Sequence, residues 1–201
     1  MSDVWADPIV RFQRRFYIPL VLLVWGIFPV FIPCYFWNEP VMSMIMGNFF
    51  RYIISLHHAW LVNSAAHISG HQFYDKSLEP RENKWVAYLS MGEGYHNYHH
   101  TFPWDYSASE YGWKYNFNVA TFFIDSLAAV GLVTERRVVS RQMIESRIAR
   151  TGDHSFSLPP SMNPDRKPRH YWLDLLTGTV VTTWTLWVTA LLHYVVRFAG
   201  V

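Results

Sequence analysis

Three histidines within five residues are the part of this sequence best suited to chemistry. His96, His99 and His100 lie in the stretch GEGYHNYHH. On a helix the spacing i, i+3, i+4 brings their imidazoles to one face. Neutral imidazole binds zinc, copper, iron and nickel. A single histidine is more often a structural residue, but three on one face favour a metal site.

A pair of polar residues earlier in the chain could extend this site. Asn63 and His67 are four residues apart, at the end of a long apolar stretch. Alone, such an asparagine usually bonds a neighbouring helix, but beside the three histidines we interpret the pair as part of the same site. Glu93 precedes His96 by three residues and is predicted to orient an imidazole without binding the metal. A capping or loop role would explain Glu93 equally well.

The other histidines and the order of the acids limit the chemistry. His71 is a weaker candidate ligand, and the remaining five have structural roles or none: His57, His58, His154, His170 and His193. A hydrolytic zinc site usually follows the order H-E-x-x-H, which this sequence lacks. The single cysteine, Cys34, excludes an internal disulfide and a cysteine-based metal site. A histidine-rich site beside a membrane instead fits oxygen activation by iron on a lipid substrate.

Composition and hydropathy place these residues beside a membrane. Only 16% of the residues are charged, compared with about 25% in typical soluble domains. Residues 16–36 contain no charged side chain and could span about 30 Å of hydrocarbon. Residues 41–68 are again largely apolar, whereas the net charge of +2 does not indicate nucleic-acid binding. We therefore predict an all-α membrane protein with a transmembrane helical hairpin in residues 16–70.

The basic residues predict how this hairpin is oriented. Three arginines precede the first span and three basic residues follow the second, whereas the connecting loop holds only Glu39. By the positive-inside rule both outer ends face the cytosol. Residues 1–15 are then a cytosolic lead-in, and residues 71–153 form a cytosolic helical domain carrying the histidine site. We expect one apolar helix in VATFFIDSLAAVGL and one amphipathic helix in RRVVSRQMIESRIAR. Residues 154–174 are a proline-bearing linker and residues 175–198 an additional C-terminal transmembrane helix.

Longer stretches of the sequence resemble a known family. NSAAH, YDKSLEPREN, GEGYHNYHHTFPWDYSASEYG and FFIDSLAAVGL resemble the integral-membrane acyl-CoA desaturases of the stearoyl-CoA delta-9 type, over about residues 2–153. The resemblance implies a multi-pass enzyme of the endoplasmic reticulum, with its histidine box facing the cytosol and two irons in the complete site. It also implies desaturation of a long-chain saturated acyl-CoA, in unsaturated fatty acid biosynthesis, with O2 and with cytochrome b5 as electron donor.

Positions that match the family's motifs carry its roles as expectations. The residues that match iron ligands are His67, His96, His99 and His100. Asn63 matches a residue that contacts the iron centre through water, and Trp60 matches a residue lining the acyl tunnel. No catalytic residue separate from the metal ligands is expected.

The chain departs from the family's pattern in its first half. The family has two earlier histidine boxes, and neither occurs here, so the sequence holds only the C-terminal portion of the pattern. Because its histidines cannot complete two iron coordination spheres, we predict little or no desaturation by these 201 residues alone. One alternative is a catalytically inactive membrane protein that self-associates or pairs with intact desaturases and regulates them. Another is a related membrane fatty acid hydroxylase, which the stretch NYHHTFPWDYSASEY disfavours.

Overall fold

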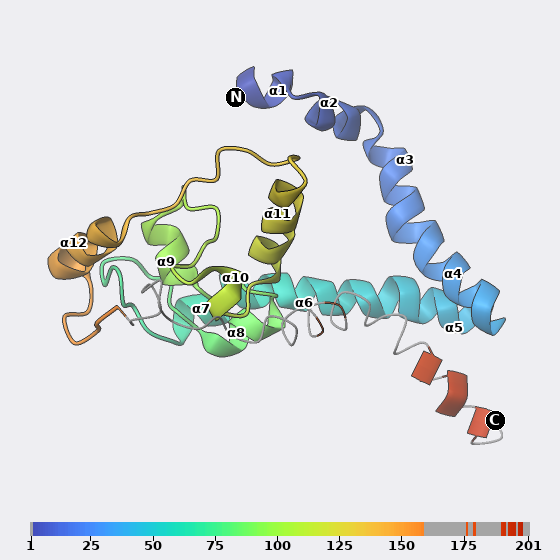
Figure 1. The fold of residues 1–201 in the computed structure, drawn as a ribbon. Coiled ribbons are helices and arrows are strands. Elements are labelled where there is room, and N and C mark those ends of the chain that lie inside the picture. The colour runs from blue at the N-terminus through green and yellow to red at the C-terminus, as the bar shows by residue number, and fades with distance from the viewer. Residues whose placement is uncertain are drawn as a thin grey trace. The chain divides into compact units, whose positions relative to one another are not determined.

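The computed structural model describes residues 2–158 together with residues 176, 179, 190, 191, 193–195, 197 and 198. Every regular element of these residues is a helix, in agreement with the predicted all-α class (Figure 1). The chain divides into two compact units, one of Met1–Ser55 with Val180–Val201 and one of Leu56–Thr179. Most of the predicted C-terminal transmembrane helix at residues 175–198 and most of the linker before it lie outside the described residues.

The first unit is built around one long apolar helix. The short helices α1 (Ser2–Ala6) and α2 (Pro8–Arg15) lead into α3 (Tyr17–Val21), a π-helical stretch (Leu22–Ile27) and α4 (Phe28–Trp37). Together Tyr17–Trp37 form a helix of 21 residues with a mean hydropathy of 2.1, and only 6% of its most apolar part is buried. This helix is long and apolar enough to cross a membrane, and it matches the predicted first span.

Proline determines how this helix packs on the next one. Pro29 has no N–H to donate to the Trp25 carbonyl one turn earlier. The Arg51 guanidinium donates to that carbonyl instead, at 2.9 Å, and also bonds the Gly47 carbonyl at 2.7 Å. Gly47 packs so closely on the Pro29 carbonyl that a Cβ at position 47 would lie 2.2 Å from its oxygen. A glycine and an arginine thus join the two helices where proline weakens the first.

The second predicted span is helical but more polar than the first. Asn38 ends α4 in a left-handed conformation, with φ of 54°. The chain then continues through α5 (Pro40–Met44), a π-helical stretch (Ile45–Phe50) and α6 (Arg51–Asn63), and after a break at Ser64 through α7 (Ala65–Ile68). Among the described residues, Tyr17–Trp37 is the one helix that meets both length and composition for a membrane span. The transmembrane hairpin therefore stays a prediction.

The second unit consists of short helices joined by long loops. Besides the end of α6 and α7, they are α8 (Lys84–Leu89), α9 (His96–Thr101), α10 (Gly112–Tyr115), α11 (Val119–Ala129) and α12 (Arg141–Thr151) (Figure 1). The last two confirm the helices expected in VATFFIDSLAAVGL and RRVVSRQMIESRIAR. The core packs α9 against α12 through these buried residues: Tyr74, Tyr98, Phe102, Val139, Ile144, Ile148 and Leu158. The histidine helix is therefore part of the hydrophobic core of its unit.

Candidate metal centre

The histidine helix α9 is capped by a carboxylate from a distant segment. Tyr95 precedes the helix and makes no side-chain cap. Glu82 takes this role, because its Oε1 accepts a hydrogen bond from the Tyr98 N–H at 2.7 Å and its carboxylate also accepts from the Asn97 backbone. Antiparallel bridges from Glu82 to His71 and to Tyr95 hold the acid in place. A negative group at a helix N-terminus is favourable, so Glu82 both starts and orients α9.

Asn97 fixes the same helix from its buried side. The Asn97 Oδ1 accepts from the N–H groups of Tyr74, at 2.9 Å, and Asp75, at 3.2 Å. Its Nδ2 donates to the carbonyls of Asp75, at 2.9 Å, and Pro80, at 3.0 Å. The side chain is fully buried and uses all of its hydrogen-bonding capacity. It therefore joins the histidine helix to the loop that precedes α8.

Three of the predicted ligands come together around the start of α9. The Nε2 atoms of His96 and His67 are 3.0 Å apart, and those of His100 and His96 are 3.2 Å apart. One ligand atom from each of the three rings lies within 4.8 Å of the other two. His67 comes from α7, 29 residues before His96. We call this group the three-histidine cluster.

The cluster has the protonation state and the spacing that a metal ion requires. Burial, with smaller contributions from His100, His67 and His99, lowers the pKa of the His96 imidazole to about 4. Burial, with His99 and His67, also lowers the pKa of His100. The rings of His96 and His100 are therefore neutral near pH 7, as metal ligands must be. Two nitrogens each about 2.1 Å from one metal, at right angles, are about 3.0 Å apart, which matches the observed distances.

His99 lies beside the three-histidine cluster without belonging to it. Its ring stacks on that of His96 with 6.1 Å between centroids. Its Nδ1 atom is buried without a hydrogen-bond partner. Because a buried nitrogen without a partner is costly, this atom is suited to a ligand. The structure thus brings His67, His96 and His100 together and leaves His99 beside them.

The remaining predicted site residues lie outside these contacts. Asn63 donates to the Ala59 carbonyl of its own helix at 3.2 Å. Trp60 is 57% exposed, and its ring lies 5.5 Å from that of His57. Glu93 is exposed in the turn before α9. The roles expected for Asn63, Trp60 and Glu93 stay predictions.

Two residues of this site were missed by sequence reasoning. Glu82 was quoted within YDKSLEPREN and Asn97 within the histidine box, but neither had a periodicity that indicated a role. Asparagine inside the run H-N-x-H-H was the one available signal, because a polar residue between ligands on a buried helix needs partners. Finding the partners requires the path of the loop.

A polar cavity of about 340 Å³ lies behind the capping carboxylate. Its lining includes Glu82, Tyr95, Glu110 and Tyr111. The Glu110 carboxyl group accepts from the hydroxyls of Tyr74 and Tyr111, whereas its buried Oε2 atom has no partner. Burial raises the pKa of Glu110 to about 7, and burial together with Glu110 raises the pKa of Glu82. Two acids that line one cavity thus oppose each other's ionisation.

We expect replacement of Glu110 by glutamine to stabilise the chain at alkaline pH. The pKa of about 7 in the folded chain exceeds the ordinary 4.5, so the folded state binds the proton more tightly than the unfolded state does. The Glu110 contribution therefore becomes more favourable as the pH falls from about 7 to about 4.5. Glu110→Gln removes the cost of the charge, and its free energy of unfolding should be about 1–3 kcal/mol higher at pH 8. The gain should disappear below pH 4.5.

Urea titrations at several pH values measure this effect. The matched control is Glu145→Gln, since Glu145 is exposed and pairs with Arg141 on its own helix. Such a surface pair contributes about 0–1 kcal/mol. A Glu110→Gln chain less stable than the wild type at pH 8 would contradict the buried-acid interpretation.

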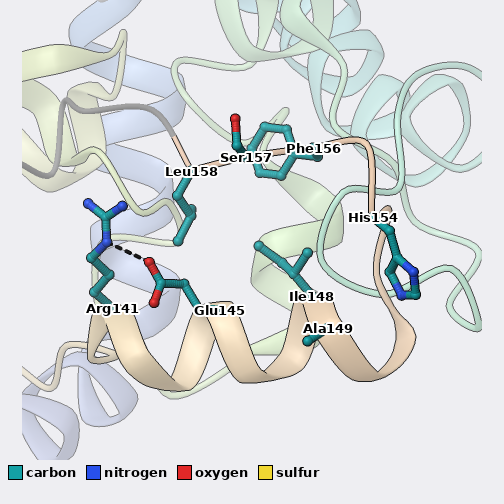
Figure 2. A pocket seen from close by; sticks show the side chains of 8 residues that line it. All are labelled: Arg141, Glu145, Ile148, Ala149, His154, Phe156, Ser157 and Leu158. Carbon is teal, nitrogen blue, oxygen red and sulfur yellow. Dashed lines mark hydrogen bonds and ion pairs between the residues drawn. The ribbon is translucent and has the colours of Figure 1, made fainter.

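A second hollow lies beside α12, away from the histidine cluster. It has a volume of about 460 Å³ and is formed by α12 and the segment after it (Figure 2). Arg141 and Glu145 lie on successive turns of α12, near Leu158. The Nε of Arg141 lies 2.7 Å from the Oε1 of Glu145. Ile148 also lines the hollow and belongs to the hydrophobic core. None of the predicted ligands lines this hollow.

Comparison with known proteins identifies relatives of this chain. No protein-family model matches the sequence. The chain is 53% identical to a stearoyl-CoA desaturase of Mesocricetus auratus over 156 residues, which are 77% of this chain and 44% of that protein. It is 50% identical to a stearoyl-CoA desaturase of Homo sapiens over 157 residues, or 78% of this chain and 43% of that protein. For a stearoyl-CoA desaturase 5 of Bos taurus the identity is 50% over 156 residues, 77% of this chain and 46% of that protein. The chain spans less than half the length of these relatives.

Proposed function

Most of this chain is homologous to part of the stearoyl-CoA desaturases, and we propose that it supplies one share of a di-iron centre that desaturates a long-chain saturated fatty acyl-CoA. The observation that carries this proposal is the three-histidine cluster, in which imidazoles from α7 and α9 converge. The homology selects iron among the metals that imidazole binds. The position of the new double bond, delta-9, is proposed from the same relatives.

The residues of this chain hold and shield the iron site. Removing two hydrogens from an unactivated acyl chain needs a strong oxidant, which iron supplies with O2 when bound. His67, His96 and His100 bring their ring nitrogens close enough together to hold one ion. Glu82 and Asn97 fix α9, so the rings need little rearrangement to bind. His99 and Asn63 are proposed to reach the rest of the centre, Asn63 through a water molecule.

The apolar helix of the chain suggests where the proposed iron centre lies in the cell. We propose that the helix Tyr17–Trp37 anchors the chain in the endoplasmic reticulum membrane and that the histidine cluster faces the cytosol. Arg11, Arg14 and Arg15 just before the helix support this orientation. Trp60 is proposed to contact the acyl chain, and cytochrome b5 to supply the electrons. The acyl-CoA and cytochrome b5 are proposed as partners of the complete desaturase.

One expression experiment separates an enzyme fragment from an inactive partner. Desaturase-deficient cells are given the chain alone, or the chain with the part of the human relative that it does not cover. We expect no monoenoic fatty acid from the chain alone, because three or four imidazoles cannot complete two iron sites. Product that appears only on co-expression, and is lost with His100→Ala, supports the proposal. Hydroxylated product would instead favour a membrane hydroxylase. A lower yield of product from an added intact desaturase would favour a regulatory partner.

A further inference from the structure

The helix α2, just before the apolar span, has two different faces. Ile9, Phe12 and Phe16 repeat at intervals of three and four residues, so they form one stripe. Ile9 is 74% exposed and Phe12 is 56% exposed, and the rings of Phe12 and Phe16 lie 4.9 Å apart. An exposed apolar stripe of this kind calls for an apolar surface to cover it.

The opposite face of α2 is basic and forms a groove. A hollow of about 500 Å³ is lined by Trp5, Arg11, Arg14 and Arg15. The Arg14 guanidinium lies 4.4 Å from the centre of the Trp5 ring, which holds it by a cation–π interaction. Within the part of the chain that the structure describes, no carboxylate lies within ion-pair distance of the three guanidinium groups. The groove therefore presents positive charge to an external anion.

The acid directly before α2 is already used to start the helix. The Asp7 Oδ1 accepts from the N–H groups of Ile9, at 2.7 Å, and Val10, at 3.2 Å, while Pro8 occupies the first helical turn. This N-cap stabilises α2 as a helix. The two faces of α2 are thus fixed by local structure.

We propose that α2 lies in the membrane surface and that its groove binds the phosphate of an acidic phospholipid. The apolar stripe enters the boundary between headgroups and acyl chains, and the arginines extend to the phosphates above it. Continuity supports a lipid occupant, because the chain enters the candidate span at Tyr17, directly after α2. The inference requires Tyr17–Trp37 to cross a membrane and is independent of iron binding and desaturation.

Lipid selectivity of the reconstituted chain tests this proposal. The full chain is placed in phosphatidylcholine vesicles with trace spin-labelled phosphatidylserine or phosphatidylcholine, and electron paramagnetic resonance gives the fraction of each label held at the protein. Each basic residue near an anionic surface contributes about 1 kcal/mol, which corresponds to about fivefold. We expect a preference for phosphatidylserine of at least about fivefold, and a loss to about one in Arg11→Gln/Arg14→Gln/Arg15→Gln.

The matched control removes the same charge from the other unit. Arg137→Gln/Arg141→Gln/Arg150→Gln replaces three exposed arginines of that unit and should keep the preference. Glutamine and arginine have similar helix propensities, so circular dichroism should show α2 retained in the first variant. An unchanged preference in the α2 variant, or an equal loss in the control, would overturn the proposal. Millimolar free coenzyme A that abolishes the preference would assign the groove to a soluble phosphate ligand, which would also overturn it.

Discussion

Replacement of Asn97 by alanine is expected to destabilise the chain by about 4 kcal/mol or more. Four backbone groups lose their partner at once, namely the N–H groups of Tyr74 and Asp75 and the carbonyls of Asp75 and Pro80. Each buried group left unsatisfied costs about 1–3 kcal/mol. Because the side chain is fully buried, water cannot replace it without a cavity. The loop before α8 and the histidine helix should separate, so metal binding should be lost together with stability.

Denaturant titration of the full chain in uncharged detergent measures this loss, and near-UV circular dichroism reports on the tyrosine-rich core. Asn116→Ala is the matched control, because Asn116 is half-buried in another loop and its loss should cost less than about 1 kcal/mol. Asn97→Asp keeps the volume and the Oδ1 acceptor, but it replaces the donating Nδ2 by an oxygen that faces the Asp75 and Pro80 carbonyls. It should therefore also be clearly less stable than the wild type. An Asn97→Ala chain as stable as the Asn116→Ala chain would show that Asn97 does not tie the two segments together.

Replacement of His96 by alanine is expected to abolish metal binding while leaving the fold intact. His96 is the central member of the cluster, because its Nε2 lies 3.0 Å from that of His67 and 3.2 Å from that of His100. Removing a residue that only orients a ligand typically costs 10–100-fold in affinity. Loss of the central ligand should therefore cost more than about 100-fold. The two remaining nitrogens cannot enclose an ion.

Anaerobic titration of the chain with Fe²⁺, read as metal retained after gel filtration, checks the expected loss. His154→Ala is the control, because His154 is exposed at the rim of the hollow beside α12. His96→Ala should unfold at a similar denaturant concentration to the wild type in the absence of metal, because the hydrophobic core cluster of the unit does not include His96. Equal iron retention by His96→Ala and His154→Ala would argue against the three-histidine cluster as the site.

Acidification is expected to release the metal from the three-histidine cluster. Protons compete with the metal for the ring nitrogens. The pKa of His96 is depressed to about 4, so this ligand keeps its affinity for metal at lower pH than an exposed histidine would. Retention that falls between about pH 6 and pH 4 is consistent with such ligands.

The local elements of this protein were predictable from the sequence alone. The spacing of His96, His99 and His100 placed them on one helix, because helix geometry depends on neighbouring residues only. The apolar run ending at Trp37 predicted a long helix for a similar reason. The helices α11 and α12 followed from their apolar periodicity. The quoted motifs also identified the desaturases as relatives, and the comparisons confirmed this.

Contacts between distant segments were decided only by the tertiary structure. The meeting of His67 with His96 spans 29 residues, and the Tyr98 cap provided by Glu82 spans 16. No periodicity encodes such pairs, because they depend on the path of the loop after α7 and on the four bonds of Asn97. His99 stands on the same helix as His96 and His100 but does not belong to the cluster. Sequence therefore determined which residues could bind a metal, and packing around a buried asparagine decided which three of them meet.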